Sequence, residues 1–173
     1  GSDQRIIEAA KILADRKLVR PIIIGQKDKI SAELKNLGKN NQALNIVEPS
    51  ISEHRELFAE NLYELRKHKG LTLERARDKI VDELYFGTMM VKTGMADGLV
   101  AGAAHSTADT IRPALQIIKP IEGVKTISSI FFMCFPEATY LFADYGIVEK
   151  PTIFQIADIT VSTAARSEER RVG

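Results

Sequence analysis

The chain has 173 residues, of which 45% are hydrophobic and 27% are charged, an ordinary composition for a folded protein that buries its core without disulfides or metals. Lys and Arg number 24 against 23 Asp and Glu, so the formal net charge is +1 and nothing in this balance calls for nucleic acid or a membrane as a partner. Cys134 is the single cysteine, which fits a reducing compartment. No apolar run approaches the length of a membrane span, and no signal-peptide pattern begins the chain. We therefore expect a cytoplasmic protein.

Helical and extended segments alternate along the chain. The first is helical, since Ile6, Ala10 and Leu13 fall on one stripe. The next is a β-branched run closed by Gly25, which is typical of a short buried strand. From the spacing of apolar residues, the capping residues and the helix-breaking residues, we predict helices over 4–17, 28–37, 52–69, 72 to 90 or 93, 107–118 and 151–165. The fourth should bend near Gly87, and the fifth should be kinked or shortened at Pro113. We predict strands over 21–25, 43–47, 98–101, 126–132 and 141–143.

This alternation predicts an α/β fold with a mostly parallel sheet that has helices on both faces. The linker-like stretch that ends at Gly123 indicates a border, with a first domain over 1–122 and the start of a second α/β domain over 123–165. The segment 166–173 changes composition abruptly, and we interpret it as a non-native tail. A frayed helix end is the alternative interpretation.

A polar cluster from His105 to Asp109 precedes Arg112 and predicts a phosphate-bearing ligand. In α/β proteins a ligand usually lies where a strand ends and the next helix begins, and the free N–H groups of a helix start can hold an anion. Ser106 and Thr107 are good N-cap residues, a role that does not exclude contact with a ligand. Arg112 could reach a phosphate at this helix start or pair with Asp109, and the sequence favours neither role.

Other residues give weaker signals. Arg66 shares a helix face with Leu62, where its guanidinium would be stabilised by an anionic partner. The alternative, which the local sequence favours, is that its aliphatic stem covers the core while the charged head pairs elsewhere. His105 stands where a general acid or base could act, but a histidine without a nucleophile or metal partner is more often structural. Cys134 follows an apolar strand, which predicts a buried thiol. The run 98–105 is neither G-x-G-x-x-G nor a phosphate loop, so the motifs argue against a nicotinamide or ATP site.

Four runs of sequence occur in order and with natural spacing. They are YELRKHKG (63–70), YFGTMMVKTGMADGLVAGAAHSTADTIRPALQIIK (85–119), VKTISSIFFM (124–133) and LFADYGIVEKPT (141–152). Together they resemble the phosphate acetyltransferases, also called phosphotransacetylases, over nearly all of residues 3–165. The block AGAAHSTADTIRP (101–113) is the most specific part of this resemblance.

The resemblance implies two α/β domains, similar to those of isocitrate and isopropylmalate dehydrogenases, with the active site in the cleft between them. It implies that acetyl-CoA and phosphate are interconverted with acetyl phosphate and CoA by a cytoplasmic homodimer, with coenzyme A as a substrate and no bound cofactor or metal. In the family, the arginines at the positions of Arg66 and Arg112 hold coenzyme A. These two, together with Ser106 and Thr107, are therefore the predicted substrate-binding residues.

Two other functions stay open. A phosphate butyryltransferase would share the same motifs, although the dense match to HSTADTIRP (105–113) favours acetyl transfer. A non-catalytic domain that binds CoA or acyl phosphate, like the one fused to some malic enzymes, is the other alternative.

The chain departs from the family's pattern in three places. The first strand of the family's fold has no counterpart before Asp3, and the segment 137–140 is shorter than in many relatives. The family's late N-D-L-S-R-G block, with its catalytic serine, arginine and aspartate, does not occur. We therefore expect a truncated fold in which no residue is catalytic, a chain that is inactive alone because charge stabilisation at the reacting centre is missing, and exposed apolar faces that favour aggregation.

Overall fold

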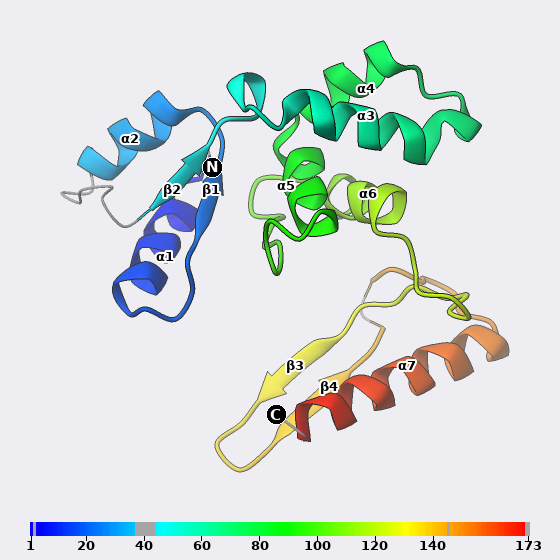
Figure 1. The fold of residues 1–173 in the computed structure, drawn as a ribbon. Coiled ribbons are helices and arrows are strands. Elements are labelled where there is room, and N and C mark those ends of the chain that lie inside the picture. The colour runs from blue at the N-terminus through cyan, green and yellow to red at the C-terminus, as the bar shows by residue number, and fades with distance from the viewer. Residues whose placement is uncertain (2, 37–43, 145, 172–173) are drawn as a thin grey trace. The chain divides into compact units, whose positions relative to one another are not determined.

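The computed structural model describes residues 1, 3–36, 44–144 and 146–171. The chain divides into two compact units, Gly1–Lys119 and Pro120–Gly173, which are described separately. Both units contain helices and strands, so the predicted α/β class is confirmed, although the two kinds of element alternate only as far as β2 (Figure 1). Within the described residues, no helix combines the length and the apolar character that crossing a membrane requires.

The first unit contains most of the predicted elements, with bounds that differ from the expected ones by a few residues. Its strands are β1 (Ile22–Ile24) and β2 (Asn45–Val47). Its helices are α1 (Gln4–Asp15), α2 (Lys27–Asn36), α3 (Arg55–Arg66), α4 (Leu73–Ile80), α5 (Glu83–Lys92) and α6 (Thr107–Ile117). Two short 3-10 helices, η1 (Pro49–Ile51) and η2 (Lys67–Lys69), flank α3.

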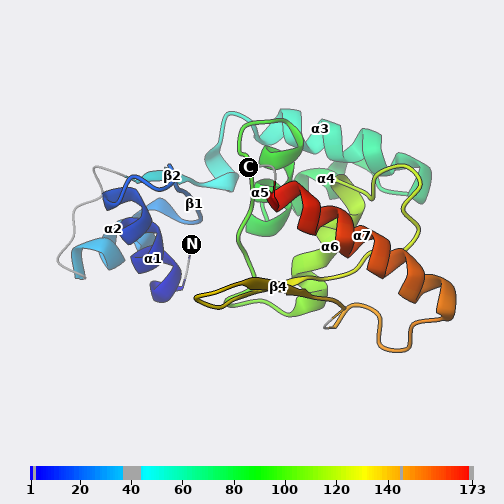
Figure 2. The ribbon, with the colours of Figure 1, turned by 90° about the horizontal axis from the view of Figure 1, so that it is seen from below.

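The strands β1 and β2 form a parallel pair with apolar packing on both faces. Ile23 lies opposite Ile46 and packs into a small core with residues of α1 and α2, which lie beside the strands in both views (Figure 1, Figure 2). Since successive side chains of a strand point to opposite faces, Ile22 and Ile24 point away from this small core. They pack instead against the larger helical core of the unit.

The larger core is built by helices α3 to α6. Phe58 of α3 and Phe86 of α5 are fully buried, and their ring centroids lie 5.0 Å apart at an interplanar angle of 57°. Such a tilted aromatic pair is favourable beyond its burial of apolar area. The other buried members of this core are Ala59, Leu62, Ala76, Ile80, Tyr85, Met89, Met90 and Ile117. This core holds α6, the helix that follows the polar cluster, against α3 and α5.

The predicted helical region over residues 72–93 is interrupted at residues 81–82, not bent at Gly87. Asp82 begins α5 as its N-cap, and its carboxylate accepts hydrogen bonds from the backbone N–H groups of Leu84 and Tyr85 at 2.9 and 3.1 Å. A carboxylate in this position starts a new helix, so the break falls there. Gly87 lies inside α5, where a Cβ atom would come within 2.8 Å of Ile24 Cδ1 and 3.0 Å of Leu99 Cδ1. Its missing side chain thus allows close packing.

The predicted strand over residues 98–101 is wrong, since this segment is a loop. Val100 is 89% exposed, and none of the described strands pairs with the segment. A run of four residues cannot form a strand without a neighbour that satisfies its backbone groups. The helix that follows is found where it was predicted, but the expected shortening at Pro113 is wrong, since α6 runs through Pro113 without interruption.

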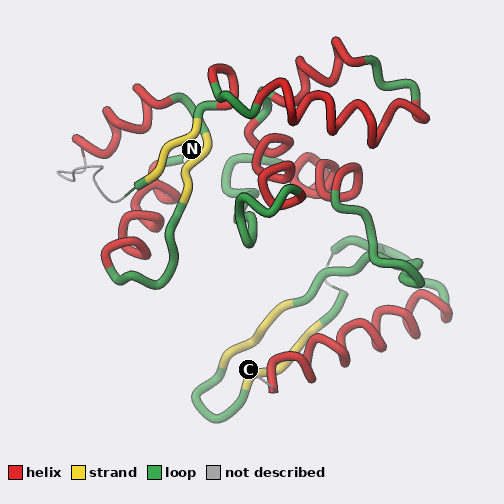
Figure 3. Tube along the Cα trace, viewed as in Figure 1, coloured by secondary structure: helices red, strands yellow, loops and turns green. Residues whose placement is uncertain are grey.

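The second unit is a hairpin with one helix, coloured yellow and red in Figure 3. β3 (Phe131–Cys134) pairs in antiparallel orientation with β4 (Thr139–Phe142), and α7 (Ile153–Arg171) packs on β4. The strand predicted over 126–132 begins only at Phe131, and the pair is antiparallel where we expected a mostly parallel sheet. The short turn between the strands permits only antiparallel pairing, since a parallel connection needs a long crossover.

Two further expectations for this unit are corrected. Cys134 is exposed, not buried, because it lies at the end of a strand whose residues are all exposed. The last helix does not end at Ala165 but continues to Arg171, into the segment set aside as a tail. Thr126 is only 6% exposed, and its hydroxyl donates to Asp158 Oδ2 at 3.0 Å, which ties the segment before β3 to α7.

Candidate functional site at the start of helix α6

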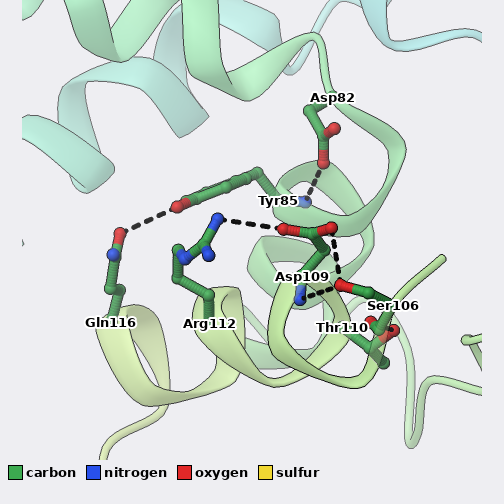
Figure 4. A network of polar contacts seen from close by, with 7 residues as sticks. All are labelled: Asp82, Tyr85, Ser106, Asp109, Thr110, Arg112 and Gln116. Atoms are coloured by element: carbon green, nitrogen blue, oxygen red, sulfur yellow. Dashed lines mark hydrogen bonds and ion pairs between the residues drawn. The ribbon is translucent and has the colours of Figure 1, made fainter.

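The polar cluster lies where the sequence places it, at the N-terminus of α6 (Figure 4). Ser106 is the N-cap, and its hydroxyl oxygen accepts a hydrogen bond from the backbone N–H of Asp109 at 3.1 Å. The same hydroxyl donates to Asp109 Oδ2 at 2.7 Å, and the Thr110 hydroxyl donates to the Ser106 carbonyl oxygen at 3.0 Å. Thr107 is exposed at the first helical position. Local capping contacts therefore fix the start of the helix.

Arg112 forms an ion pair with Asp109, three residues earlier on the same helix. Its Nη1 lies 3.0 Å from Asp109 Oδ1, and both side chains are half-exposed, at 55% and 52%. The Ser106 hydroxyl, which donates to the carboxylate, is the main cause that lowers the pKa of Asp109 below its ordinary 3.8. The charge of Arg112 lowers this pKa further, while partial loss of solvation opposes both. Of the two roles that the sequence left open for Arg112, the pair with Asp109 is the one formed here.

The body of α6 is fixed by a contact with α5 that the sequence analysis missed. The Tyr85 hydroxyl donates to Gln116 Oε1 at 2.9 Å, across the two helices (Figure 4). Tyr85 is only 8% exposed, so this hydrogen bond lies at the edge of the core. A tyrosine inside an apolar helix run, with a glutamine on a later helix, carries no pairing signal in the sequence.

The loop before α6 is held by contacts at two points. Leu99 packs on α5 at the position of Gly87, and the guanidinium of Arg5 donates from Nη2 to the Ala103 carbonyl oxygen at 3.2 Å. The loop then reaches His105, which is exposed and whose charge also lowers the pKa of Asp109. His105 thus follows a loop, not a strand end as predicted.

Arg66 lies at the C-terminal end of α3, in the same unit as α6. Its side chain is half-buried, and within the described residues its guanidinium has no carboxylate partner. The neighbouring Lys67, in contrast, pairs with Glu64 at 2.5 Å. Ser106, Thr107 and Arg112 are therefore gathered on one helix start, whereas the structure records no contact that joins Arg66 to them.

Two open hollows stand out among the described residues, and neither is lined by the predicted substrate-binding residues. A groove of about 750 Å³ lies between β4 and α7, and a smaller one of about 320 Å³ lies over residues 14–21. In the described part of the chain, no three His, Cys, Asp or Glu side chains are grouped as metal ligands. The features that could hold an anion are thus exposed N–H groups, hydroxyls and guanidinium groups, and not a closed pocket.

The carboxylate of Asp144 is held by several hydrogen bonds within the second unit. Asp144 accepts from the backbone N–H groups of Ser129, Ile147 and Val148, at 2.9, 3.2 and 2.6 Å, and from the Ser129 hydroxyl. Burial by itself raises the pKa of this carboxyl, but the hydrogen bonds outweigh burial and lower the pKa below its ordinary range. Asp144 therefore joins Ser129 to the segment at Ile147 and Val148, and Tyr145 lies outside the described residues.

Comparison with known proteins decides the family. The sequence pattern of the phosphate acetyl/butaryl transferase family matches residues 1–170. The chain belongs to this family. The match confirms the resemblance found in the sequence, and it extends into the segment 166–173.

Members of the family are similar to this chain in both sequence and fold. The chain is 47% identical to a phosphate acetyltransferase of Bacillus subtilis over 95% of its length, and 41% identical to one of Helicobacter pylori over 98%. A phosphotransacetylase from Streptococcus pyogenes has 42% identity and a TM-score of 0.84 over 92% of the chain. EutD phosphotransacetylase from Staphylococcus aureus has 39% identity and a TM-score of 0.83 over 91%.

The family members are longer than this chain. It spans 50% of the Bacillus subtilis relative, 33% of the Helicobacter pylori relative and 49% of the Streptococcus pyogenes structure. The similarity therefore establishes the family and the fold of the matched part, and the activity of the whole protein is a matter of proposal.

Proposed function

We propose that this chain binds coenzyme A as part of an acyltransferase that exchanges acetyl groups between coenzyme A and phosphate. The observation that carries the proposal is the family match over residues 1–170, with relatives named phosphate acetyltransferase at 47% and 41% identity. The start of α6 supports it, because free N–H groups, the Ser106 and Thr107 hydroxyls and the Arg112 guanidinium are the groups that hold phosphates.

The pair between Arg112 and Asp109 is compatible with this role. Both side chains are half-exposed, and ion pairs that face water are weak because the solvent screens them and each partner loses conformational freedom. A phosphate can displace one carboxylate oxygen and accept two parallel N–H donors from the guanidinium. Arg112 would then turn from Asp109 to the substrate when coenzyme A binds.

Arg66 is proposed as the second phosphate-binding arginine. The Arg66 side chain is half-buried and has no carboxylate partner among the described residues, so its guanidinium would gain from an anion. Lys67 and Lys69 follow it at the end of α3, so the local charge attracts a nucleotide. We propose that Arg66 and Arg112 approach the same substrate molecule from different helices of one unit.

In the proposed reaction, the thiolate of coenzyme A attacks the acetyl carbon of acetyl phosphate, and phosphate leaves. The developing negative charge needs preorganised donors, whose contribution to rate is usually the largest. The N-D-L-S-R-G block that supplies such groups in the family does not occur in this sequence. We therefore propose that this chain binds substrate but does not catalyse the exchange by itself, and that the complete enzyme acts as a homodimer with no bound cofactor.

Calorimetric titration of coenzyme A into the purified chain tests the proposal. Arg112→Ala and Arg66→Ala should each weaken binding by about 1.5 to 3 kcal/mol, the contribution of a hydrogen bond to a charged group, or roughly 10- to 150-fold in Kd. Arg77→Ala is the matched control, since Arg77 also forms an exposed ion pair, with Glu56 at 2.8 Å, and should leave binding unchanged. Absence of coenzyme A binding, or equal affinity in all variants, overturns the proposal.

A non-catalytic binding domain is the second candidate function, and it would be favoured if the full open reading frame also lacked the N-D-L-S-R-G block. The two candidates predict the same coenzyme A binding but different behaviour of the complete protein. Formation of acetyl phosphate by the full open reading frame supports the transferase, and binding without turnover supports the regulatory domain. Comparing the rates at which the full open reading frame converts acetyl-CoA and butyryl-CoA to their acyl phosphates decides between acetyl and butyryl transfer.

A further inference from the structure

An arginine far from α6 in the sequence holds the loop that leads into this helix. Arg5 lies in the first turn of α1, and its Nη2 donates to the Ala103 carbonyl oxygen at 3.2 Å, 98 residues along the chain. Ala103 comes shortly before Ser106, the N-cap of α6. The contact therefore joins α1 to the segment that sets the position of the helix start.

Asp3 fixes the direction in which Arg5 points. Its two carboxylate oxygens accept from Nε and Nη2 of Arg5 at 3.0 and 2.6 Å, so the guanidinium is held by two parallel hydrogen bonds. The same carboxylate accepts from the backbone N–H of Arg5 at 2.9 Å and caps α1. The hydrogen bond from the Arg5 side chain is the main reason that the pKa of Asp3 falls to about 2. Asp3 therefore stays ionised and paired in neutral solution.

The loop between α5 and α6 depends on outside contacts for its course, since residues 95–105 form neither helix nor strand. Gly102 has a φ of 107°, a conformation that favours glycine, and a Cβ atom on it would lie 3.6 Å from Thr110 Oγ1. The loop thus passes beside the first turn of α6, where the Thr110 hydroxyl donates to the Ser106 carbonyl oxygen at 3.0 Å. A shift of the loop at Ala103 would therefore displace the turn that Ser106 caps.

We propose that Arg5 is a positioning residue for the phosphate-binding start of α6. By holding Ala103, it sets the positions of the backbone N–H groups and of the Ser106 and Thr107 hydroxyls at this helix start. A helix start binds an anion best when its N–H groups are already aligned, because aligning them on binding costs conformational free energy. This inference rests on the proposed binding of coenzyme A at α6, and it gives Arg5 a role that acts through the loop.

A direct contact between Arg5 and the substrate is the alternative, and one substitution separates the two roles. If Arg5 itself held a phosphate, Asp3 would compete for the guanidinium, so Asp3→Asn would strengthen binding or leave it unchanged. If Arg5 acts through the loop, Asp3→Asn frees the guanidinium from its fixed direction and weakens binding. Asparagine is as good an N-cap as aspartate, so α1 is retained in this variant.

Hydrogen exchange of the full chain, measured by NMR without ligand, tests whether the contact orders the helix start. The backbone N–H groups of Asp109 and Thr110 bond to the hydroxyl and carbonyl oxygens of Ser106 at 3.1 and 3.0 Å. Arg5→Ala and Asp3→Asn should each speed exchange of these two amides about tenfold, because local opening becomes easier. Amides in the buried part of α5 should exchange as in the wild type.

Calorimetric titration of coenzyme A tests the consequence for binding. Both variants should raise Kd about tenfold, the order expected when one hydrogen bond of a charged group is lost. Arg5→Lys should not restore the affinity, since an ammonium group lacks the planar fork that pairs with a carboxylate and leaves further donors free. Arg16→Ala is the matched control, because it removes an exposed arginine at the other end of α1 and should change neither exchange nor affinity.

The two measurements separate failure of this inference from failure of the proposed function. A wild-type chain that does not bind coenzyme A would overturn the proposed function and this role with it, even if the exchange result showed that the contact orders the loop. With binding established, unchanged exchange at Asp109 in Arg5→Ala, faster exchange that extends into the core of α5, or an unchanged Kd would each overturn the inference. Equal or tighter binding by Asp3→Asn, or full rescue by Arg5→Lys, would also overturn it, in favour of a direct contact between Arg5 and the substrate.

Discussion

The hydrogen bond between Tyr85 and Gln116 predicts an asymmetric pair of mutational effects. Tyr85 is 8% exposed and donates to Gln116 Oε1 at 2.9 Å, whereas Gln116 is only half-buried and can turn to water. Tyr85→Phe removes the donor and leaves an acceptor that water satisfies, so the cost is about 1 kcal/mol, the net contribution of one hydrogen bond. Gln116→Leu leaves the buried hydroxyl without its partner, which costs about 1 to 3 kcal/mol.

The double variant decides whether this reasoning is correct. With both polar groups removed, no unsatisfied hydroxyl remains, so Tyr85→Phe/Gln116→Leu should be no less stable than Gln116→Leu alone. Urea unfolding followed by circular dichroism measures the free energies, and a slope of about 2 kcal/mol per molar urea converts 1 kcal/mol into a midpoint shift of about 0.5 M. Strictly additive costs in the double variant would show that the two side chains are not coupled.

Three further outcomes are expected. Ser106→Ala should destabilise the first unit by about 1 kcal/mol through loss of the N-cap, and should raise the pKa of Asp109 in an NMR titration; an unchanged pKa would contradict the hydrogen bond between them. Asp144→Asn should weaken the second unit by about 1.5 to 3 kcal/mol at neutral pH. Folding lowers the pKa of Asp144 from 3.8, so its carboxylate stabilises the folded state above that pH and loses this effect as the pH falls. The difference in free energy of unfolding between wild type and variant should therefore become smaller in acid, and a constant difference would contradict this. Phe86→Ala should cost about 3 to 5 kcal/mol in thermal unfolding, since this ring is fully buried against Phe58, and a cost below about 1 kcal/mol would refute that packing.

Local signals were sufficient for most of the helices and for the start of α6, but they did not locate the break between α4 and α5. Thr72 and Ser106 cap their helices through hydrogen bonds to backbone N–H groups three residues later, as the sequence chemistry of these residues predicts. Capping depends on neighbours within one turn, which is why it can be read from sequence. The position of the helix break at Asp82 followed the same rule, although the glycine at position 87 was the more obvious signal.

Strands were harder to predict, because a strand depends on a partner that the local sequence does not contain. The apolar run at residues 98–101 has the composition of a buried strand but has no neighbour to pair with, and it forms a loop instead. Cys134 was expected to be buried since it ends an apolar strand, yet the face of that strand has no covering layer in this structure. Burial is a property of the whole assembly of layers and not of a single run of residues.

By itself the sequence determined the family, the α/β class, most of the helices and the place of the polar cluster at a helix start. These features follow from motifs, periodicity and capping, which act over a few residues. Only the tertiary structure decided that Arg112 pairs with Asp109, that Tyr85 joins α5 to α6 and that β3 is exposed along its whole length. Each of these depends on which side chains fold into contact, and contacts between distant parts of a chain are set by packing in three dimensions.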